Sequence, residues 1–144
     1  MSTRKQFSTF FVDGLFFGVE VKRVQEVISY HEMTSVPLAH PVVQGLINLR
    51  GQIVTALDVR RRLGLSERPE TLLPMNVVIC HEDGVVSLLA DEIGDVIEVD
   101  EEKFEAPPDT LDANARSLIS GVYKLDDRLL HVMNADRVLD IARS

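Results

Sequence analysis

The residues of this chain that could carry out chemistry are few and widely separated. No HExxH sequence and no paired Cys/His spacing occurs, so no metal site is indicated. Cys80 follows the apolar run Val77–Ile79 and has no basic neighbour in sequence, which predicts a buried, unreactive thiol. The acidic run Glu98–Glu102 lacks the alternating ligands of a calcium loop and favours a solvated surface. We therefore expect no active site, no cofactor and no metal, although the chain has four histidines, His31, His40, His81 and His131.

Charge narrows the choice of partners. The formal net charge is −8, which argues against nucleic acid and against an anionic membrane surface, because both need clustered Lys and Arg. The only basic cluster is Arg60–Arg62, and we interpret it as a complement to the dipole at the end of a short helix. The single cysteine indicates a reducing compartment, and no run reaches the roughly 18 apolar residues of a membrane span.

One segment in the first half has a clear local structure. The apolar segments Gly45–Leu49 and Ile53–Leu57 flank a turn at Arg50 and Gly51, as in a β-hairpin. Asp58 then has the side chain of a helix N-cap. The segment is predicted to form strand, turn, strand and short basic helix, with the Arg50 side chain free to reach a partner.

The same unit occurs again later in the chain without a gap. When the sequence is aligned with itself at an offset of 76 residues, the helix-capping positions coincide and apolar residues align with apolar residues. We interpret this as an internal duplication of a small β module. Chance similarity between two strand–turn–strand–helix units is the alternative. The matched pairs include Gly45 with Gly121, Leu49 with Leu125, Asp58 with Asn134, Arg61 with Arg137 and Leu63 with Leu139.

The remaining segments also indicate strands. Asp13-Gly14 joins two apolar arms, as Asp83-Gly84 does later, and Asp-Gly is a strong hairpin signal. Lys22–Val27 alternates less clearly and is expected to be a short helical turn. About nine or ten short strands with turns every 8–12 residues predict an all-β barrel or sandwich. Because no long linker is visible, we expect one domain over residues 1–144, in which two small barrels share strands or a core.

One motif then resembles a known family. The sequence GLINLRGQIV at positions 45–54, followed by LDVR at 57–60, is similar to the signature of the CheW-like chemotaxis coupling proteins. Further similarity lies in VQEVI at 24–28, DEIGDVI at 91–97 and SGV at 120–122, and the match covers roughly residues 6–142. The resemblance implies two intertwined five-stranded SH3-like β-barrels with a few short helices and a C-terminal helix.

The resemblance also implies a function without catalysis. Proteins of this family connect a CheA-type histidine kinase to the cytoplasmic tips of methyl-accepting chemoreceptors. The regulatory domain of the kinase has the same fold and pairs with the coupling protein barrel to barrel. The helical hairpin of the receptor lies in a groove between the two barrels. A cytoplasmic protein recruited to membrane-associated receptor arrays is therefore expected.

The receptor-facing residues follow from the family motif by position. They should form an apolar groove, with Val24 and Val27 sharing one face of the expected helical turn. Ile93 and Val96 have the same spacing at the equivalent place in the second half. Plain core positions are the alternative for these four residues. The full set of expected receptor-binding residues is Val24, Glu26, Val27, Arg50, Ile93 and Val96.

Two other functions remain open on the sequence alone. A small enzyme could assemble a site from scattered residues such as His131 and Asp91, although no nucleophile–base pattern supports it. A β-barrel adaptor could instead bind a peptide unrelated to chemotaxis. A pull-down with a receptor tip and a kinase regulatory domain separates these possibilities.

Overall fold

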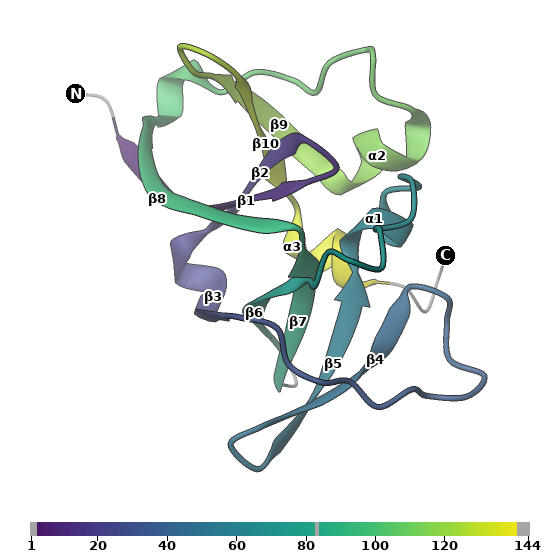
Figure 1. The fold of residues 1–144 in the computed structure, drawn as a ribbon. Helices are drawn as coiled ribbons and strands as arrows, with labels where there is room; N and C mark the ends of the chain where they lie inside the picture. The colour runs from purple at the N-terminus through teal and green to yellow at the C-terminus, as the bar shows by residue number, and fades with distance from the viewer. Residues whose placement is uncertain (1–2, 83, 141–144) are drawn as a thin grey trace.

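The structure is a computed structural model that describes residues 3–82 and 84–140. Within them, strands dominate and the helices are short (Figure 1). The strands are β1 (Arg4–Val12), β2 (Leu15–Glu20), β3 (Val24–Ile28), β4 (Val43–Leu49), β5 (Gln52–Asp58), β6 (Met75–His81), β7 (Gly84–Ala90), β8 (Glu92–Asp100), β9 (Ile119–Lys124) and β10 (Leu129–Met133). The α-helices are α1 (Val59–Arg62), α2 (Ala113–Leu118) and α3 (Ala135–Leu139), and 3₁₀ turns cover Val21–Arg23 and Glu101–Lys103.

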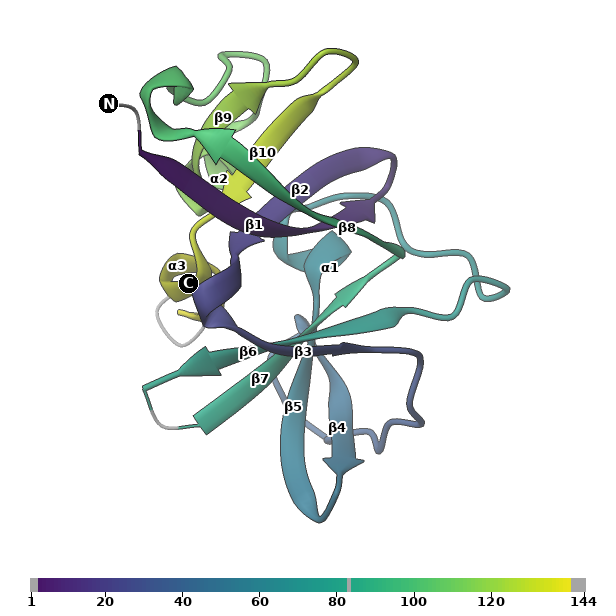
Figure 2. The ribbon, with the colours of Figure 1, turned by 90° about the vertical axis from the view of Figure 1, so that its left-hand side faces the viewer.

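The strands form two five-stranded sheets, which we call sheet A and sheet B. Sheet A has the order β8-β1-β2-β10-β9, and sheet B has the order β3-β6-β7-β5-β4. Each sheet combines a hairpin from one half of the chain with three strands from the other half, so hairpins are exchanged between the halves. Strands of the two halves pair in parallel at β2 with β10 and at β5 with β7, and antiparallel at β1 with β8 and at β3 with β6. This exchange confirms the expectation of two intertwined five-stranded units (Figures 1 and 2).

The internal repeat is visible in the elements themselves. Strands β4 and β5 with helix α1 correspond to β9 and β10 with α3, in the order that the 76-residue shift predicts. The N-caps also correspond, because the Asp58 side chain accepts from the amide of Arg60 and the Asn134 side chain from that of Arg137. The two halves therefore share this order of elements and the same type of N-cap.

Each sheet curls toward closure through one isolated bridge. Thr34, beyond β3, pairs with Leu46 of β4, and Glu105, beyond β8, pairs with Val122 of β9. The repeated glycines lie beside these bridges. A Cβ atom on Gly45 would lie 2.8 Å from the carbonyl oxygen of Thr34, and one on Gly121 would collide with the Phe104 ring and the Glu105 carbonyl. The absence of a side chain at these two glycines therefore allows the segment with Thr34 to approach β4 and the segment with Glu105 to approach β9.

Three apolar clusters hold the sheets. The largest lies between them and takes buried side chains from both, including Phe10 and Phe17 of sheet A and Ile79 and Leu88 of sheet B. A second cluster belongs to sheet A, and a third to sheet B. Fully burying an aliphatic or aromatic side chain contributes about 1.5–3 kcal/mol, so the shared cluster is the main contact that fixes one sheet against the other.

The helical turn expected over Lys22–Val27 is wrong. A 3₁₀ turn ends at Arg23, and Val24 starts β3, which pairs with β6. Strand β3 then ends at Ile28. The irregular alternation of this segment comes from a register shift between Val24 and Glu26, where the strand bulges.

Candidate functional site

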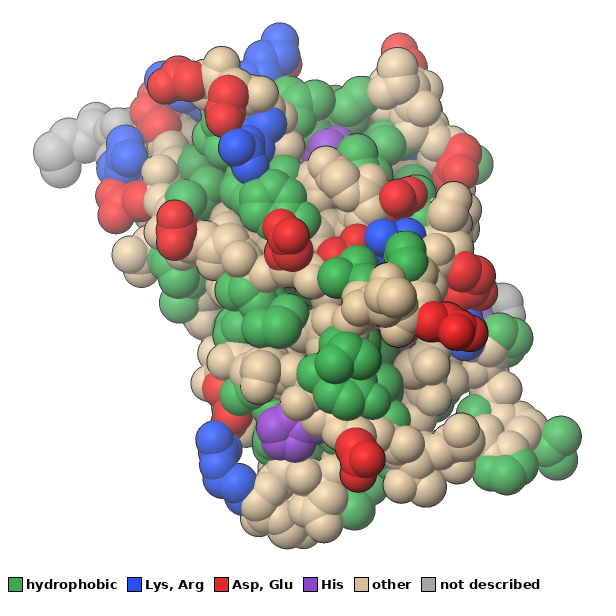
Figure 3. Space-filling model, in the orientation of Figure 1, with side chains coloured by type: hydrophobic (Ala, Val, Ile, Leu, Met, Phe, Trp, Pro, Cys, Tyr) green, Lys and Arg blue, Asp and Glu red, His purple; other side chains and the backbone are tan. Residues whose placement is uncertain are grey.

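Two edge strands lie on the same side of the molecule. Strand β3 is an outer strand of sheet B, and β8 is an outer strand of sheet A. Figures 1 and 2 both show β8 above β3 on this side. Figure 3 shows hydrophobic side chains interspersed with acidic ones on the face seen in Figure 1. The four apolar residues singled out from the sequence all come from these two strands.

The β3 pair shares a face, but for a different reason from the one expected. Val24 pairs with Ile79 and Val27 with Val77, and both partners belong to the cluster between the sheets. Residues three apart in a regular strand would point to opposite faces. The bulge adds one residue and restores the same side. Val24 and Val27 are half-buried and pack against the shared core.

The β8 pair repeats this geometry. Ile93 pairs with Phe10 and Val96 with Ser8, across a register shift that again places residues three apart on one face. Ile93 is half-buried against the shared core, whereas Val96 is 58% exposed. The structure therefore brings the two pairs to equivalent edge strands, with Val96 as the most exposed of the four.

Glu26 and Arg50 form one ion pair rather than two separate groups. Arg50 lies in the turn between β4 and β5, with φ of 54° followed by 87° at Gly51, the left-handed pair of a type I′ turn. Its Nη1 and Nη2 donate to the two Glu26 carboxylate oxygens at 2.7 and 2.8 Å. The Arg50 side chain is 73% exposed and that of Glu26 19%. The hydrogen bond from Arg50 lowers the pKa of Glu26, so the carboxylate stays charged.

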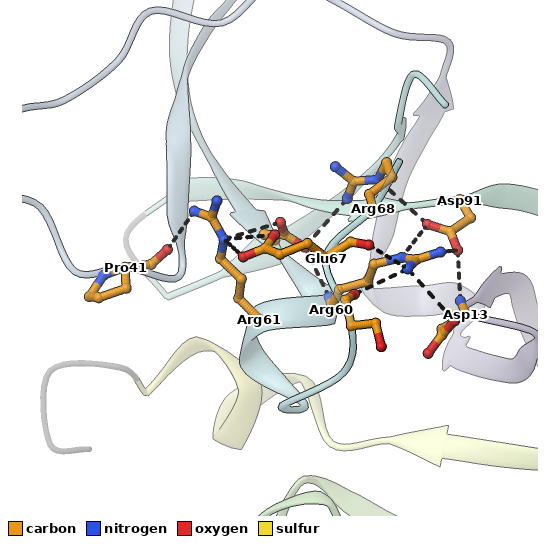
Figure 4. Close-up of polar contacts among 9 residues, drawn as sticks. Asp13, Pro41, Arg60, Arg61, Glu67, Arg68 and Asp91 are labelled. Carbon is orange, nitrogen blue, oxygen red and sulfur yellow. Dashed lines mark hydrogen bonds and ion pairs between the residues drawn. The ribbon is translucent and has the colours of Figure 1, made fainter. Parts of the chain in front are cut away.

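The arginines of α1 are not merely complements to a helix dipole. Arg60 is buried and donates to both Asp91 carboxylate oxygens, at 3.1 Å from Nε and 2.7 Å from Nη2 (Figure 4). Arg62 donates to the carbonyls of Arg137 and Val138. All three arginines do lie in the last turn of α1, as the dipole interpretation expects, but that interpretation misses the specific partners of Arg60 and Arg62. The pairing of Arg60 with Asp91 could not be predicted because the residues are 31 positions apart.

Burial and hydrogen bonding oppose each other at Asp91. Burial raises the pKa of its carboxyl, but hydrogen bonds from Arg60 and from the Asp13 amide outweigh burial and hold the pKa below 3.8. The Asp13 amide donates to Oδ2 at 2.6 Å. Arg68 adds a second charge, with its Nε 3.5 Å from Oδ1. Asp91 is consequently a charged carboxylate in a dense group of ion pairs.

The residues of the enzyme hypothesis have separate partners. His131 is buried, and its Nδ1 lies 2.9 Å from the carbonyl oxygen of Phe16. Asp91 is bound by arginines at the junction of the sheets. Across residues 3–82 and 84–140, no group of three or more His, Cys, Asp or Glu side chains could hold a metal ion. Nothing in this geometry brings His131 and Asp91 into one site.

Cys80 is exposed, which contradicts the expectation of a buried thiol. It lies one residue before the end of β6, and the side chains of Ile79 and Cys80 point to opposite faces. Asp83, expected in the following turn, lies outside the described residues. Arg23 also contacts this position, donating to the Cys80 carbonyl at 3.2 Å.

We therefore expect a thiol reagent to label Cys80 in the native protein. The rate should lie within about tenfold of the rate in denaturant, since exposure and thiolate fraction control such reactions. Mass spectrometry over time measures the rate, and Cys80→Ser provides the unlabelled control. Labelling of the native protein more than a hundredfold slower than in denaturant would contradict the exposed position.

The fold first defines a class, namely an intertwined two-unit β protein of SH3-like type. The chain matches the family model described as CheW-like domain over residues 6–143. The chemotaxis protein CheW of Bacillus subtilis is 31% identical over 140 residues, covering 97% of this chain and 90% of that protein. The chemotaxis protein CheW of Rhizobium meliloti is 30% identical over 122 residues, covering 85% and 79%. The chain belongs to the CheW-like family and is a chemotaxis coupling scaffold.

A solved structure supports the fold. The scaffolding protein TtCheW from Thermoanaerobacter tengcongensis superimposes with a TM-score of 0.86, at 24% identity, covering 99% of this chain and 97% of that one. The SH3-like, two-unit architecture expected from the sequence is thereby confirmed. None of the helices in the described residues combines the length and hydrophobicity needed to cross a bilayer.

Proposed function

We propose that this scaffold connects a CheA-type histidine kinase to the cytoplasmic tips of methyl-accepting chemoreceptors, without catalysing a reaction. The observation that carries the proposal is the pair of equivalent edge strands on one side of the molecule, with Val24 and Val27 on β3 and Ile93 and Val96 on β8. A helical hairpin is recognised when its apolar face enters a hydrophobic groove, and we take these two strands as the walls of such a groove. The protein would act in the cytoplasm at receptor arrays, as one domain held together by the core shared between its sheets.

The kinase would use another surface. Its regulatory domain is expected to have the same two-unit fold and to dock sheet unit against sheet unit, which leaves the groove between β3 and β8 for the receptor. The two ligands should therefore bind together rather than compete. Capture of a receptor tip and a kinase regulatory domain by the same protein molecule tests this proposal, and failure to capture either would overturn it.

The ion pair between Arg50 and Glu26 has a predictable part in receptor binding. We expect Arg50→Ala to lower receptor affinity several-fold while changing Tm by less than about 2 °C, because the Arg50 side chain is largely exposed. The lost guanidinium leaves Glu26 as an unpaired carboxylate beside the groove. Calorimetric titration with a receptor tip measures the affinity, and a thermal melt measures stability. The control is Arg128→Ala, which removes an exposed ion pair with Asp127 elsewhere. A large fall in Tm with normal receptor affinity would make Arg50 a structural residue only.

A further inference from the structure

Both strands that line the proposed groove begin directly after a charged residue held by a helix. At β8 that residue is Asp91, which Arg60 of α1 binds through two hydrogen bonds. The Asp13 carboxylate, in the turn of the β1–β2 hairpin, lies 3.6 Å from Arg60 Nη1 (Figure 4). The amide of Asp91 donates to the carbonyl of Phe11. We call this contact the β8 ion pair, and it lies where the chain passes from sheet B to sheet A.

An equivalent contact precedes β3. Arg23 is the last residue before that strand, and its Nη2 donates to Oδ1 of Asp136 at 2.9 Å. Arg23 also donates to the carbonyl of Cys80, and the Nδ1 atom of His81 lies 4.0 Å from the same Asp136 oxygen. Both of these residues belong to the hairpin β6–β7. We call this contact the β3 ion pair, and it lies where the chain passes from sheet A to sheet B.

The two ion pairs are related by the internal repeat, with their charges exchanged. Arg60 is the second residue of α1 and Asp136 is the second residue of α3, and they coincide under the 76-residue shift. Asp91 and Arg23 each immediately precede the groove strand of the other half. Each ion pair therefore combines a helix and a hairpin of one half with the crossover of the other half. An arginine on the helix faces an aspartate in one case, and an aspartate on the helix faces an arginine in the other.

Their surroundings differ. The β8 ion pair is buried, with side-chain exposures of 7% for Arg60 and 8% for Asp91. The β3 ion pair is more open, with 29% for Arg23 and 69% for Asp136. Buried bidentate pairs are rigid and resist screening, whereas exposed pairs are weak and salt-sensitive. The start of β8 is consequently fixed, and the start of β3 is the more adjustable wall of the groove.

We propose that the Arg60–Asp91 and Arg23–Asp136 ion pairs are positioning contacts that hold the first residues of β8 and β3 and thereby set the separation of the two groove walls. This inference rests on the proposed function, because the groove is taken as the receptor site. The four residues act through Val24, Val27, Ile93 and Val96 and need not touch the receptor. Added salt should weaken the hold on the first residues of β3 at a lower concentration than the hold on those of β8.

The test uses the full chain and a helical hairpin from a chemoreceptor tip. Arg23→Gln removes the β3 ion pair, and the double variant Arg23→Asp with Asp136→Arg rebuilds it with the polarity of the β8 ion pair. We expect Arg23→Gln to accelerate amide exchange in β3 and to weaken hairpin binding, each by roughly threefold to fivefold. Tm should change by less than about 2 °C. The double variant should restore both quantities to within about twofold of wild type.

Arg4→Gln is the matched control. It removes an exposed ion pair with Glu98 of β8, 2.6 Å long, that lies away from the crossover, and it should change neither quantity. Asp91→Asn should accelerate exchange in β8 rather than in β3. If that variant does not fold, the Arg23 series decides alone.

Each outcome has a meaning. Unchanged exchange in β3 of Arg23→Gln, faster exchange with unchanged hairpin affinity, or an equal effect of Arg4→Gln would overturn the inference. Failure of the proposed function would give a separate result, which leaves the positioning role intact. If wild type does not bind the hairpin while β3 exchange still follows removal and restoration of the ion pair, the positioning contacts stand and the receptor assignment falls.

Discussion

Gly121→Ala is expected to lower the free energy of unfolding by about 3 kcal/mol and Tm by about 10 °C. The added Cβ would collide with the Phe104 ring and with the Glu105 carbonyl, and Glu105 is the residue that bridges to β9. The side chain of Phe104 can rotate away, but the backbone carbonyl cannot move without loss of the bridge. The cost of this overpacking therefore exceeds the gain of about 0.4–1 kcal/mol from a less flexible unfolded chain.

Two other glycines provide the comparison. Gly45→Ala should cost less than Gly121→Ala, because the nearest atom is the Thr34 carbonyl oxygen at 2.8 Å. Gly18→Ala should cost about 1 kcal/mol, since its closest contact is the end of the Leu130 side chain at 2.9 Å, which can adjust. Denaturant unfolding of the three variants measures this order. Equal stability of Gly121→Ala and Gly18→Ala would show that the bridge beside β9 does not constrain the fold.

The repeat was readable from the sequence because its signals are local. Gly45 and Gly121 mark the same close approach, and Asp58 and Asn134 cap the same helix. Each cap depends on residues near it in the chain, and the glycines are recognised by recurring at the same place in the two copies. The exchange of hairpins depends instead on the parallel pairing of β2 with β10 and of β5 with β7, which brings distant segments together. No local pattern in β2 or β5 indicates which half it will join, so the sequence predicted shared strands but not the partners.

The bulges explain the one wrong element. A strand alternates with a period of two, and an inserted residue turns a spacing of two into a spacing of three. Val24 and Val27 therefore look like neighbours on a helix, although both belong to β3. The conclusion that they share a face is correct, and the helical reason for it is wrong. In one short segment, the hydrophobic spacing of a bulged strand cannot be distinguished from that of a helical turn.

The ion pairs and the exposed Cys80 thiol show a second limit of prediction from sequence. Arg60 and Asp91 are 31 positions apart, and no spacing rule connects them. One signal was present, since the repeat places Arg60 on Asp136, an exchange of charge at an otherwise equivalent position. Cys80 follows three apolar residues, so no alternation showed which way its side chain points. Its exposure depends on where β6 ends, which is the least predictable property of a strand.

Val96→Glu should reduce binding of a chemoreceptor tip by at least about thirtyfold, because a carboxylate would have to lose water against an apolar helix face. Val96 is the most suitable of the four groove residues for this test, since it is 58% exposed and a polar residue there leaves the core intact. Val27→Glu would be ambiguous, as Val27 packs against the shared core and the charge could unfold the protein. For Val96→Glu we expect a Tm within about 2 °C of wild type.

Two controls complete the design. Val96→Thr keeps a β-branched side chain without charge and should lose less than about tenfold in receptor affinity. Leu73→Glu places the same charge on an apolar residue of similar exposure, 57%, outside the strands, and should bind the receptor normally. Binding of the kinase regulatory domain should be unchanged in all three variants, because the kinase is assigned to another surface. If folded Val96→Glu binds the receptor tip with wild-type affinity, or if Leu73→Glu loses as much, the groove between β3 and β8 is not the receptor site.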